Sequence, residues 1–214
     1  MNRKIFFSTL LFAGLLLGHI SSLAAQTSNE EGTRVRILTF NILHGETLKG
    51  DFDLDYLARV ITEVNPDLVA LQEVDLRTNR ALKLDLVSEL GLRTALNPLF
   101  GRAMYFDGGE YGEGILSRYS FLSTRNNPLP AREGKEPRAA LEVQVQLPSG
   151  DTLTFIGTHL DHTRDETDRL AQAEELNKLY AECDGPMILS GDLNARPESE
   201  TSVSPAIAWW CSLS

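Results

Sequence analysis

The end of one apolar run places two polar side chains where they can do chemistry. The run from Met187 to Leu189 leads to Gly191, and Asp192 and Asn194 follow, two positions apart. Residues two apart on an extended backbone face the same side. Asp192 can then activate or orient water, while Asn194 can hold the oxyanion of a transition state. A capping turn explains the same residues, and the spacing alone leaves both interpretations open.

Three more strand-like runs end in polar residues that suit a metal or a phosphate: Asn41, Glu73 and His159. A carboxylate at the end of a buried strand is costly unless it is paired, solvated or bound to a metal. Because Mg²⁺ is typically held by one or two carboxylates with waters and substrate phosphate, Glu73 is predicted to be a metal ligand. The Asn41 amide can bind a phosphate oxygen or a metal-bound water, and His159 can donate to a phosphate oxygen or a leaving group. The recurrence favours a hydrolytic site.

Other interpretations remain open for the same residues. Taken singly, Asn41 fits a strand-end cap and Glu73 a solvent-facing strand end. His159, Asp161 and His162 could instead form a zinc site. Adjacent strand residues point to opposite faces, however, and the chain shows no further histidine-rich ligand set. A zinc hydrolase is therefore the weaker alternative.

The order of the predicted elements indicates an α/β fold. Helices are predicted from Leu54 to Val64 with Asp53 as cap, from Arg80 to Leu90 ending at Gly91, and from Glu166 to Glu182 with Leu170, Ala173, Leu176 and Leu179 inward. Strands are predicted at residues 34–41, 67–72, 115–117, 121–124, 141–147 (half-exposed) and 152–158, and before Gly191. The glycine-rich segment 105–114 is interpreted as a mobile loop. This order favours mixed sheets with helices outside them.

Residues 1–25 are predicted to be a secretory signal peptide. Arg3 and Lys4 supply a positive start, Ile5 to Leu17 an apolar run too short to span a bilayer comfortably, and Ser22 to Ala25 small residues for cleavage. An uncleaved membrane anchor is the alternative. Since no second apolar stretch of spanning length follows, the mature chain is expected to be periplasmic or extracellular, without stable membrane insertion.

One acidic domain is expected after the signal. Residues 26–33 are interpreted as a leader, 34–200 as the domain and 201–214, which carry no charge, as an atypical tail. The net charge of −10 repels nucleic acid in general, although a metal in a cleft inverts the local field. An oxidising compartment permits a bridge between Cys183 and Cys211, but unpaired thiols are the favoured interpretation.

Several short motifs occur in one order along the chain: Leu38-Thr39-Phe40-Asn41, Leu71-Gln72-Glu73-Val74, Gly114-Ile115-Leu116-Ser117-Arg118, Thr158-His159-Leu160-Asp161 and Gly191-Asp192-Leu193-Asn194. Together they resemble the endonuclease/exonuclease/phosphatase family of DNase I-like, metal-dependent phosphoesterases. The resemblance covers about residues 34–198, and the ordered set is far more specific than any single motif.

The resemblance implies a four-layer α/β sandwich, with two mixed β-sheets face to face and helices outside. It also implies Mg²⁺ or Mn²⁺ and cleavage of a phosphoester by attack of water. By position, Asn41 and Glu73 match metal and phosphate sites, and His159 matches a catalytic histidine. Asp192 and Asn194 match the water-activating and oxyanion positions.

Arginines and one tyrosine extend the candidate list. Arg102 and Tyr105 lie where such enzymes often place phosphate contacts, in a predicted loop before the glycine-rich segment. Arg138 is a further candidate phosphate contact, although a solvated surface arginine is the favoured interpretation. Arg169 is interpreted as a surface residue of the last helix.

The sequence departs from the family pattern near its C-terminal end. The family implies a further strand with an aspartate and a terminal Ser-Asp-His, which the printed sequence lacks, so the sandwich is expected to be incomplete there and its activity impaired. The prediction is an exported, monomeric, Mg²⁺-dependent phosphodiesterase or phosphatase. Its expected substrate is a lipid head group, sugar phosphate or nucleotide rather than duplex DNA. A non-catalytic remnant or binding module of the same fold is the alternative.

Overall fold

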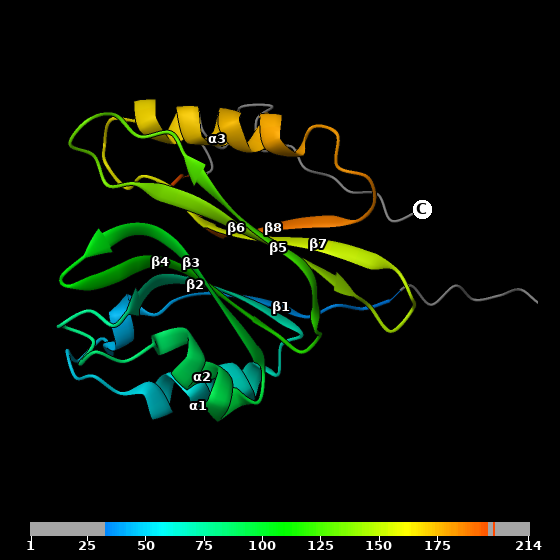
Figure 1. The fold of residues 1–214 in the computed structure, drawn as a ribbon, viewed down its shortest axis with the longest axis horizontal. Helices are drawn as coiled ribbons and strands as arrows, with labels where there is room; N and C mark the ends of the chain where they lie inside the picture. The colour runs from blue at the N-terminus through cyan, green and yellow to red at the C-terminus, as the bar shows by residue number, and fades with distance from the viewer. Residues whose placement is uncertain (1–32, 197–198, 200–214) are drawn as a thin grey trace, which may run out of the picture. The chain divides into compact units, whose positions relative to one another are not determined.

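Two four-stranded β-sheets lie face to face in this computed structural model, which describes residues 33–196 and residue 199 (Figure 1). The strand order is β1-β2-β4-β3 in the first sheet and β5-β6-β7-β8 in the second. The strands are β1 (Ile37–Asn41), β2 (Leu68–Leu76), β3 (Asn97–Phe106), β4 (Gly109–Ser117), β5 (Phe121–Leu129), β6 (Arg138–Gln146), β7 (Thr152–His159) and β8 (Met187–Asp192).

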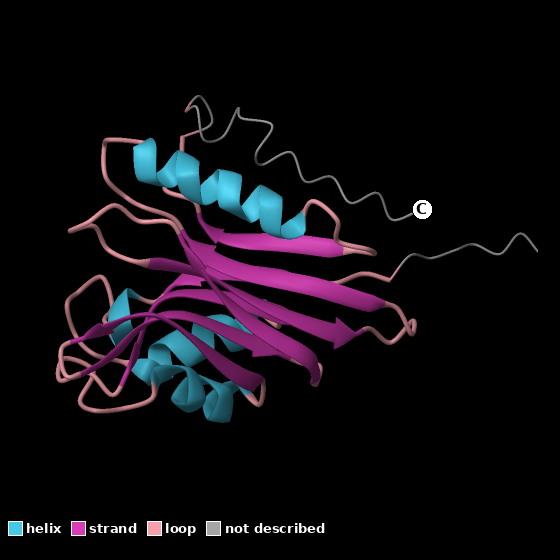
Figure 2. Cartoon of the chain, turned by 45° about the horizontal axis from the view of Figure 1, so that its top comes forward, coloured by secondary structure: helices cyan, strands magenta, loops and turns pink. Residues whose placement is uncertain are grey.

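Helices cover the outer face of each sheet. α1 (Leu54–Val64) and α2 (Leu86–Thr94) lie on the first sheet, and α3 (Thr167–Tyr180) lies on the second (Figures 1 and 2). β1 and β2 run parallel, as do β7 and β8, while the remaining neighbours are antiparallel. Both sheets are therefore mixed, and the predicted four-layer α/β sandwich is confirmed.

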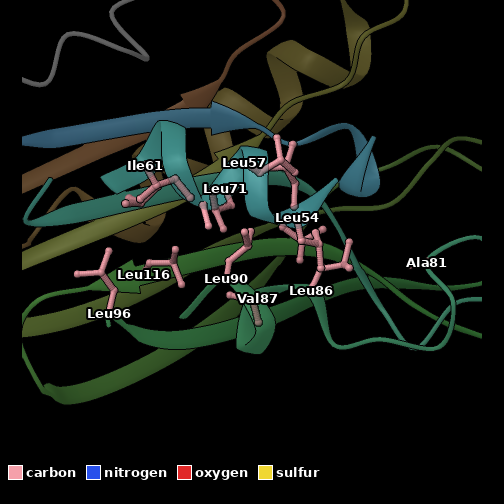
Figure 3. Close-up of a cluster of buried hydrophobic side chains, with 14 residues drawn as sticks. Leu54, Leu57, Ile61, Leu71, Ala81, Leu86, Val87, Leu90, Leu96 and Leu116 are labelled. Carbon is pink, nitrogen blue, oxygen red and sulfur yellow. The ribbon is translucent and has the colours of Figure 1, made fainter. Parts of the chain in front are cut away.

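The first helical layer is held by an apolar cluster. Asp53 caps α1 as predicted, because its Oδ1 accepts a hydrogen bond from the Tyr56 amide at 2.8 Å. Buried side chains of both helices meet the first sheet in Figure 3: Leu54, Leu57 and Ile61 of α1 and Leu86, Val87 and Leu90 of α2, against Leu71 and Leu116. The apolar spacing of α1 thus gives one buried face.

A second apolar cluster fills the space between the two sheets. It contains Leu68, Ala70 and Ile115 from the first sheet, with Leu141, Val143, Val145, Leu153 and Phe155 from the second. Gly157 of β7 also faces the first sheet, since a Cβ placed there would meet Ala70 Cβ at an ordinary contact distance of 3.4 Å. The apolar residues of the alternating pattern predicted for residues 141–147 therefore face the other sheet. β6 is less exposed than expected, because Glu142 on its opposite face is also buried.

The second helix begins later than predicted. Asp85 caps α2 by accepting from the Ser88 amide at 3.1 Å, whereas Leu82 and Lys83 adopt left-handed φ values of 55° and 63° that a helix excludes. The helix also continues past Gly91 to Thr94. Gly91 serves close packing rather than termination, because a Cβ there would lie 2.9 Å from the Leu96 carbonyl oxygen.

The glycine-rich segment predicted to be a mobile loop is a β-hairpin of β3 and β4. Asp107 and Gly108 turn the chain with φ values of 44° and 73°, as a tight Asp-Gly hairpin turn requires. Gly112 faces Gly101 so closely that a Cβ would lie 2.0 Å from the Gly101 carbonyl oxygen. The glycines here permit close contact between neighbouring strands. The composition alone had suggested a mobile loop. Strands predicted to stop at residues 72 and 124 likewise extend to Leu76 and Leu129.

The last helix presents a different face from the one predicted. Leu170 is only half-buried and Leu179 is exposed, whereas Ala173 and Leu176 are buried as expected. The buried face also includes Asp168, Arg169, Gln172 and Tyr180. The interpretation of Arg169 as a surface residue is wrong. Its Nη1 donates to the carbonyl oxygens of Asp161 and Thr163 at 2.8 and 3.0 Å.

Several sequence predictions fall outside the described residues. They are the signal peptide at 1–25, the leader up to residue 32, the atypical tail at 201–214 and the partner Cys211. Within residues 33–196 no helix is long and apolar enough to cross a membrane.

Candidate active site

Polar residues from both sheets meet where two parallel strand pairs end. The register of β1 and β2 pairs Asn41 with Gln72, next to Glu73, and that of β7 and β8 pairs His159 with Asp192. Glu73, His159, Asp192 and Asn194 line one pocket of about 390 Å³. Asn41 lines an adjoining pocket that also contains Asp192 and Asn194. The structure therefore brings these five predicted residues together.

Glu73 is placed by a β-bulge. It was predicted to end its strand, but β2 continues to Leu76, and the pairing with β4 shifts between Leu71 and Val74. Glu73 itself has φ 57°, an unusual value that a bulge accommodates while re-aiming the side chain. Its carboxylate thereby reaches the pocket from within the strand.

Asn41 orients the Glu73 carboxylate. Asn41 Nδ2 donates to Glu73 Oε1 at 2.8 Å, while Asn41 Oδ1 accepts from the Leu43 amide at 3.0 Å. His44, which the sequence analysis did not select, places its Nδ1 3.8 Å from Glu73 Oε2. The carboxylate is thus held on one oxygen, and the other oxygen faces a histidine ring.

His159 is buried at the end of β7 against Arg138. Arg138 Nη1 lies 3.1 Å from His159 Nδ1, and Arg138 Nη2 lies 3.2 Å from His162 Nδ1. Burial, and then the positive charge of Arg138, lower the pKa of His159 to about 4, so its ring is neutral at pH 7. Arg138 is only 2% exposed, so its interpretation as a solvated surface arginine is wrong. In the neighbouring sequence, the one sign that Arg138 is buried is Glu136, which forms an ion pair with Arg138 at 3.0 Å.

Asp192 and Asn194 form a turn that also faces the pocket. Asp192 Oδ1 accepts from the Asn194 amide at 3.0 Å, and Asn194 has φ 48°. Their shared side therefore comes from a turn rather than from the extended backbone assumed in the prediction. Asn194 Nδ2 donates to the Leu160 carbonyl at 3.0 Å, and Asp192 Oδ2 lies 3.8 Å from His159 Nε2. The capping and functional interpretations both fit.

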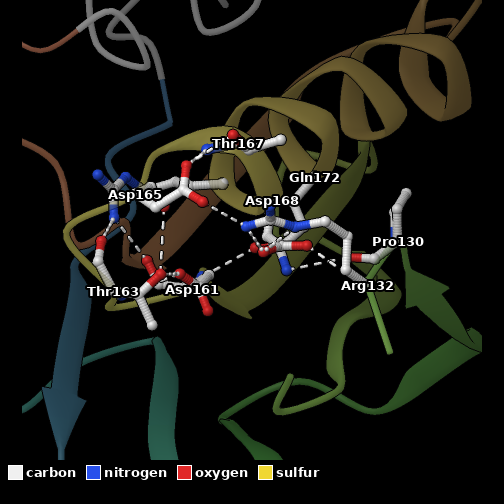
Figure 4. A network of polar contacts seen from close by, with 9 residues as sticks. Pro130, Arg132, Asp161, Thr163, Asp165, Thr167, Asp168 and Gln172 are labelled. Carbon is white, nitrogen blue, oxygen red and sulfur yellow. Dashed lines mark hydrogen bonds and ion pairs between the residues drawn. The ribbon is translucent and has the colours of Figure 1, made fainter. Parts of the chain in front are cut away.

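A buried polar network holds the loop that follows His159 (Figure 4). Asp161 Oδ1 accepts from the amide and hydroxyl of Thr163, and the Asp161 amide donates to Gln172 Oε1 at 2.8 Å. Gln172 Nε2 in turn donates to the Pro130 carbonyl at 3.1 Å. These bonds tie α3 both to the loop that follows His159 and to the loop before β6.

One wall of the pocket consists of residues that the sequence did not single out. Arg80 lines it with Phe106 and Tyr111, and both carboxylate oxygens of buried Asp75 bind the Arg80 guanidinium at 2.6 and 2.9 Å. The guanidinium carbon lies 4.6 Å from the Phe106 ring centre. Burial raises the pKa of Tyr111, which is neutral at pH 7. The close spacing of Asp75 and Arg80 was the available signal.

Arg102 and Tyr105 lie elsewhere. Both belong to strand β3 rather than to a loop. Arg102 Nη1 binds Glu110 Oε1 at 3.1 Å, and its guanidinium carbon lies 4.3 Å from the Tyr105 ring centre. Tyr105 lines a separate pocket around the hairpin turn at Asp107. The structure does not bring this pair to the other predicted residues, and their phosphate contact stays a prediction.

The donor set fits a hard divalent cation better than zinc. Glu73 offers carboxylate oxygens to the pocket, and Mg²⁺ commonly takes one or two carboxylates, with water and phosphate completing its shell. In the described part of the chain, no three histidine, cysteine, aspartate or glutamate side chains gather as a metal cluster. His159 and His162 direct their Nδ1 atoms to Arg138, so the zinc alternative gains no support.

Paired mixed sheets, outer helices and a polar pocket at the strand ends define a DNase I-like α/β sandwich. A model of the endonuclease/exonuclease/phosphatase family matches residues 38–211, and the chain belongs to that family. Its members are generally hydrolases that act on phosphoester bonds and use divalent metal ions.

Solved structures show the same fold. An endonuclease/exonuclease/phosphatase from Beutenbergia cavernae is 24% identical with a TM-score of 0.64, covering 76% of this chain and 48% of that one. This chain thus spans about half the length of that protein. D. rerio TDP2, solved with a single strand DNA product, is 22% identical with a TM-score of 0.62, covering 79% and 64%. The human Nocturnin catalytic domain with bound sulfate is 21% identical with a TM-score of 0.59, covering 80% and 70%.

Proposed function

We propose that this chain is a Mg²⁺-dependent phosphoesterase that cleaves its substrate by attack of water. The observation that carries the proposal is the convergence of Glu73, His159, Asp192 and Asn194 on one pocket from two different sheets. Family membership supplies the reaction class, and the pocket supplies groups suited to each part of it.

Asp192 is the group that accepts the proton of the attacking water. Its Oδ1 is occupied by the Asn194 amide, and its Oδ2 faces the pocket near His159. A new bond forms between the water oxygen and phosphorus, the bond to the leaving oxygen breaks, and that oxygen takes a proton from solvent. His159 and the remaining Asn194 N–H donate hydrogen bonds to phosphoryl oxygens as negative charge builds on them.

Glu73 is the residue that would hold the divalent ion, with Asn41 fixing its carboxylate. Bound Mg²⁺ or Mn²⁺ would polarise the phosphoryl oxygen and screen the acidic pocket from an anionic substrate. Oxygen donors of this kind suit either ion.

A small phosphate ester suits the site better than duplex DNA. The chain carries a net charge of −10, which disfavours long polyanions. The pocket of about 390 Å³ has room for one phosphoryl group and part of its substituent. Lipid head groups, sugar phosphates and nucleotides are the proposed classes, and the single strand DNA product in D. rerio TDP2 keeps nucleotides among them. The signal-like residues 1–25 favour action outside the cytoplasm.

The test is hydrolysis of bis(p-nitrophenyl) phosphate and p-nitrophenyl phosphate with and without Mg²⁺. Glu73→Ala and Asp192→Ala are each expected to lower kcat/KM by at least about a hundredfold, because each removes a group acting at the reacting phosphate. Glu63→Ala, on the exposed face of α1, is the matched control. Equal activity in all variants would refute the assignment. Binding of the esters without hydrolysis would favour the alternative, a non-catalytic binding module.

A further inference from the structure

Arg138 lies between two histidine rings and is shielded from water. Its side chain is 1% exposed, and its Nη1 forms an ion pair with Glu136 Oε1 at 3.0 Å. The same Nη1 lies 3.1 Å from His159 Nδ1, and Nη2 lies 3.2 Å from His162 Nδ1. One guanidinium therefore contacts the same ring position of both histidines.

The chemistry of the partners decides which atom carries each proton. A guanidinium has five N–H donors, no acceptor, and stays charged at any ordinary pH. At hydrogen-bond distance from it, a histidine nitrogen must accept, so Nδ1 of each ring carries no proton. A neutral ring then carries its proton on Nε2. For His159, this N–H faces the space beside Asp192, whose Oδ2 lies 3.8 Å from Nε2.

We infer that Arg138 is a positioning residue that holds His159 and His162 as Nε2–H tautomers. The guanidinium is pre-organised for this task by Glu136 and by its burial at the start of β6. His159 thereby presents a donor to the pocket and is withheld from acting as the base there. Asp192 is left as the residue that takes the proton of water.

The pocket gains selectivity from this arrangement. A neutral N–H donor stabilises an oxygen that carries negative charge, and it also avoids the close ion pair that an imidazolium would form with Asp192. The site therefore favours an anionic phosphoryl group over a neutral ester of similar shape. This catalytic consequence rests on the proposed function, whereas the tautomer assignment does not.

The decisive experiment is long-range ¹H–¹⁵N correlation NMR of the full chain labelled at its histidine nitrogens. The chain has four histidines, so His159→Gln and His162→Gln assign the signals. Both rings are expected to show an acceptor-type Nδ1 and a protonated Nε2 at pH 7.5. A protonated Nδ1 in His159 of the wild type would overturn the inference without any further variant.

Arg138→Met tests the cause, because methionine fills similar space and offers no donor. The signals of both rings are expected to shift toward a mixture of tautomers. Arg80→Met removes another arginine of the pocket, which binds Asp75 instead of a histidine, and should leave both tautomers unchanged. Unaltered tautomers in folded Arg138→Met protein would contradict the assignment.

Steady-state kinetics test the positioning role of Arg138 separately. Arg138→Met is expected to lower kcat at least about tenfold, and Arg138→Lys, which retains a donor, to keep more of it. Equal losses in both variants would count against positioning through a hydrogen bond. If the wild type hydrolyses no phosphoester, the proposed function fails, while the NMR result still decides the tautomer.

Discussion

Glu113 on β4 is a buried carboxyl group behind the candidate active site. Neither of its oxygens accepts a hydrogen bond from any described residue. Burial raises its pKa to about 8, against the opposing charge of Arg138, and the carboxylates of Glu73, Glu136 and Asp192 add to the rise. Glu113 is therefore protonated in the folded protein at pH 7, and its sequence context, between two glycines, gave no sign of this.

The expected consequence is a stability that falls as pH rises. The folded state binds the Glu113 proton more tightly than the unfolded chain does. The contribution of Glu113 to the free energy of unfolding is therefore fully present below the usual pKa of 4.5, and it is lost as the pH rises to about 8. Glu113→Gln removes this titration. The free energy of unfolding of the variant, relative to that of the wild type, should therefore rise by up to about 1.4 kcal/mol per pH unit in this window.

Urea unfolding at pH 5 and pH 8, with EDTA present, measures the effect. Glu63→Gln, an exposed carboxylate on α1, serves as the control and should show a constant difference from the wild type. A Glu113→Gln difference that does not grow with pH would mean that Glu113 is charged in the folded state.

Asn41 offers a second test at the level of single residues. Because its amide fixes the Glu73 carboxylate at 2.8 Å, Asn41→Ala should weaken Mn²⁺ binding about 10- to 100-fold in calorimetric titration. Asn79→Ala removes a comparable amide bond, to Asp107 at 3.0 Å on the hairpin turn, and should bind Mn²⁺ like the wild type. Equal affinity in both variants would show that Asn41 does not position the ligand.

At the scale of elements, the approach of β8 to β7 brings His159 beside Asp192. Gly191 pairs with Thr158 one step before that pair, and a Cβ on Gly191 would lie 1.9 Å from the Thr158 carbonyl oxygen. Gly191→Ala must therefore separate the strands or distort them, and a destabilisation of about 3 kcal/mol is expected.

Chemical denaturation and the phosphoester assay measure both effects of this change. Gly157→Ala is the matched control on β7, since its Cβ would meet Ala70 at an ordinary 3.4 Å and should cost much less. If Gly191→Ala matched Gly157→Ala in stability and activity, the tight approach of the strands would be unimportant.

The helices and strands also show which local sequence patterns were sufficient to predict an element and its bounds. α1 was predicted with its bounds and cap, because an aspartate cap and a strong apolar face agree there. α2 was misplaced because good helix formers at residues 80–84 are recruited into turns, where Arg80 binds Asp75. The hairpin was missed because its glycines record contact between neighbouring backbones, which no local periodicity reveals.

At the scale of the molecule, the site depends on the two sheets staying packed face to face. Phe155 is fully buried between them, so Phe155→Ala should lower the free energy of unfolding by about 3–5 kcal/mol. Leu48→Ala, at an exposed loop residue, should change it by less than about 0.5 kcal/mol. Equal midpoints in thermal unfolding would contradict the packing between the sheets.

The sequence singled out Asn41, Glu73, His159, Asp192 and Asn194, because each follows or interrupts an apolar strand and so stands out as a polar residue. The structure brings these five residues to two adjoining pockets, and their roles stay a prediction. Arg138, Arg80 and Glu113 were misjudged or missed, since a charged residue in a sequence resembles a surface residue until its burial is known.

The sequence by itself determined the family, the mixed sheets and the residue types of the candidate site, because strand endings and ordered motifs are local properties. Only the tertiary structure decided that a bulge aims Glu73, that an Asx turn joins Asp192 to Asn194, and that Arg138 lies between two histidines. These contacts join residues distant along the chain or depend on backbone geometry, and sequence spacing carries neither distance nor burial.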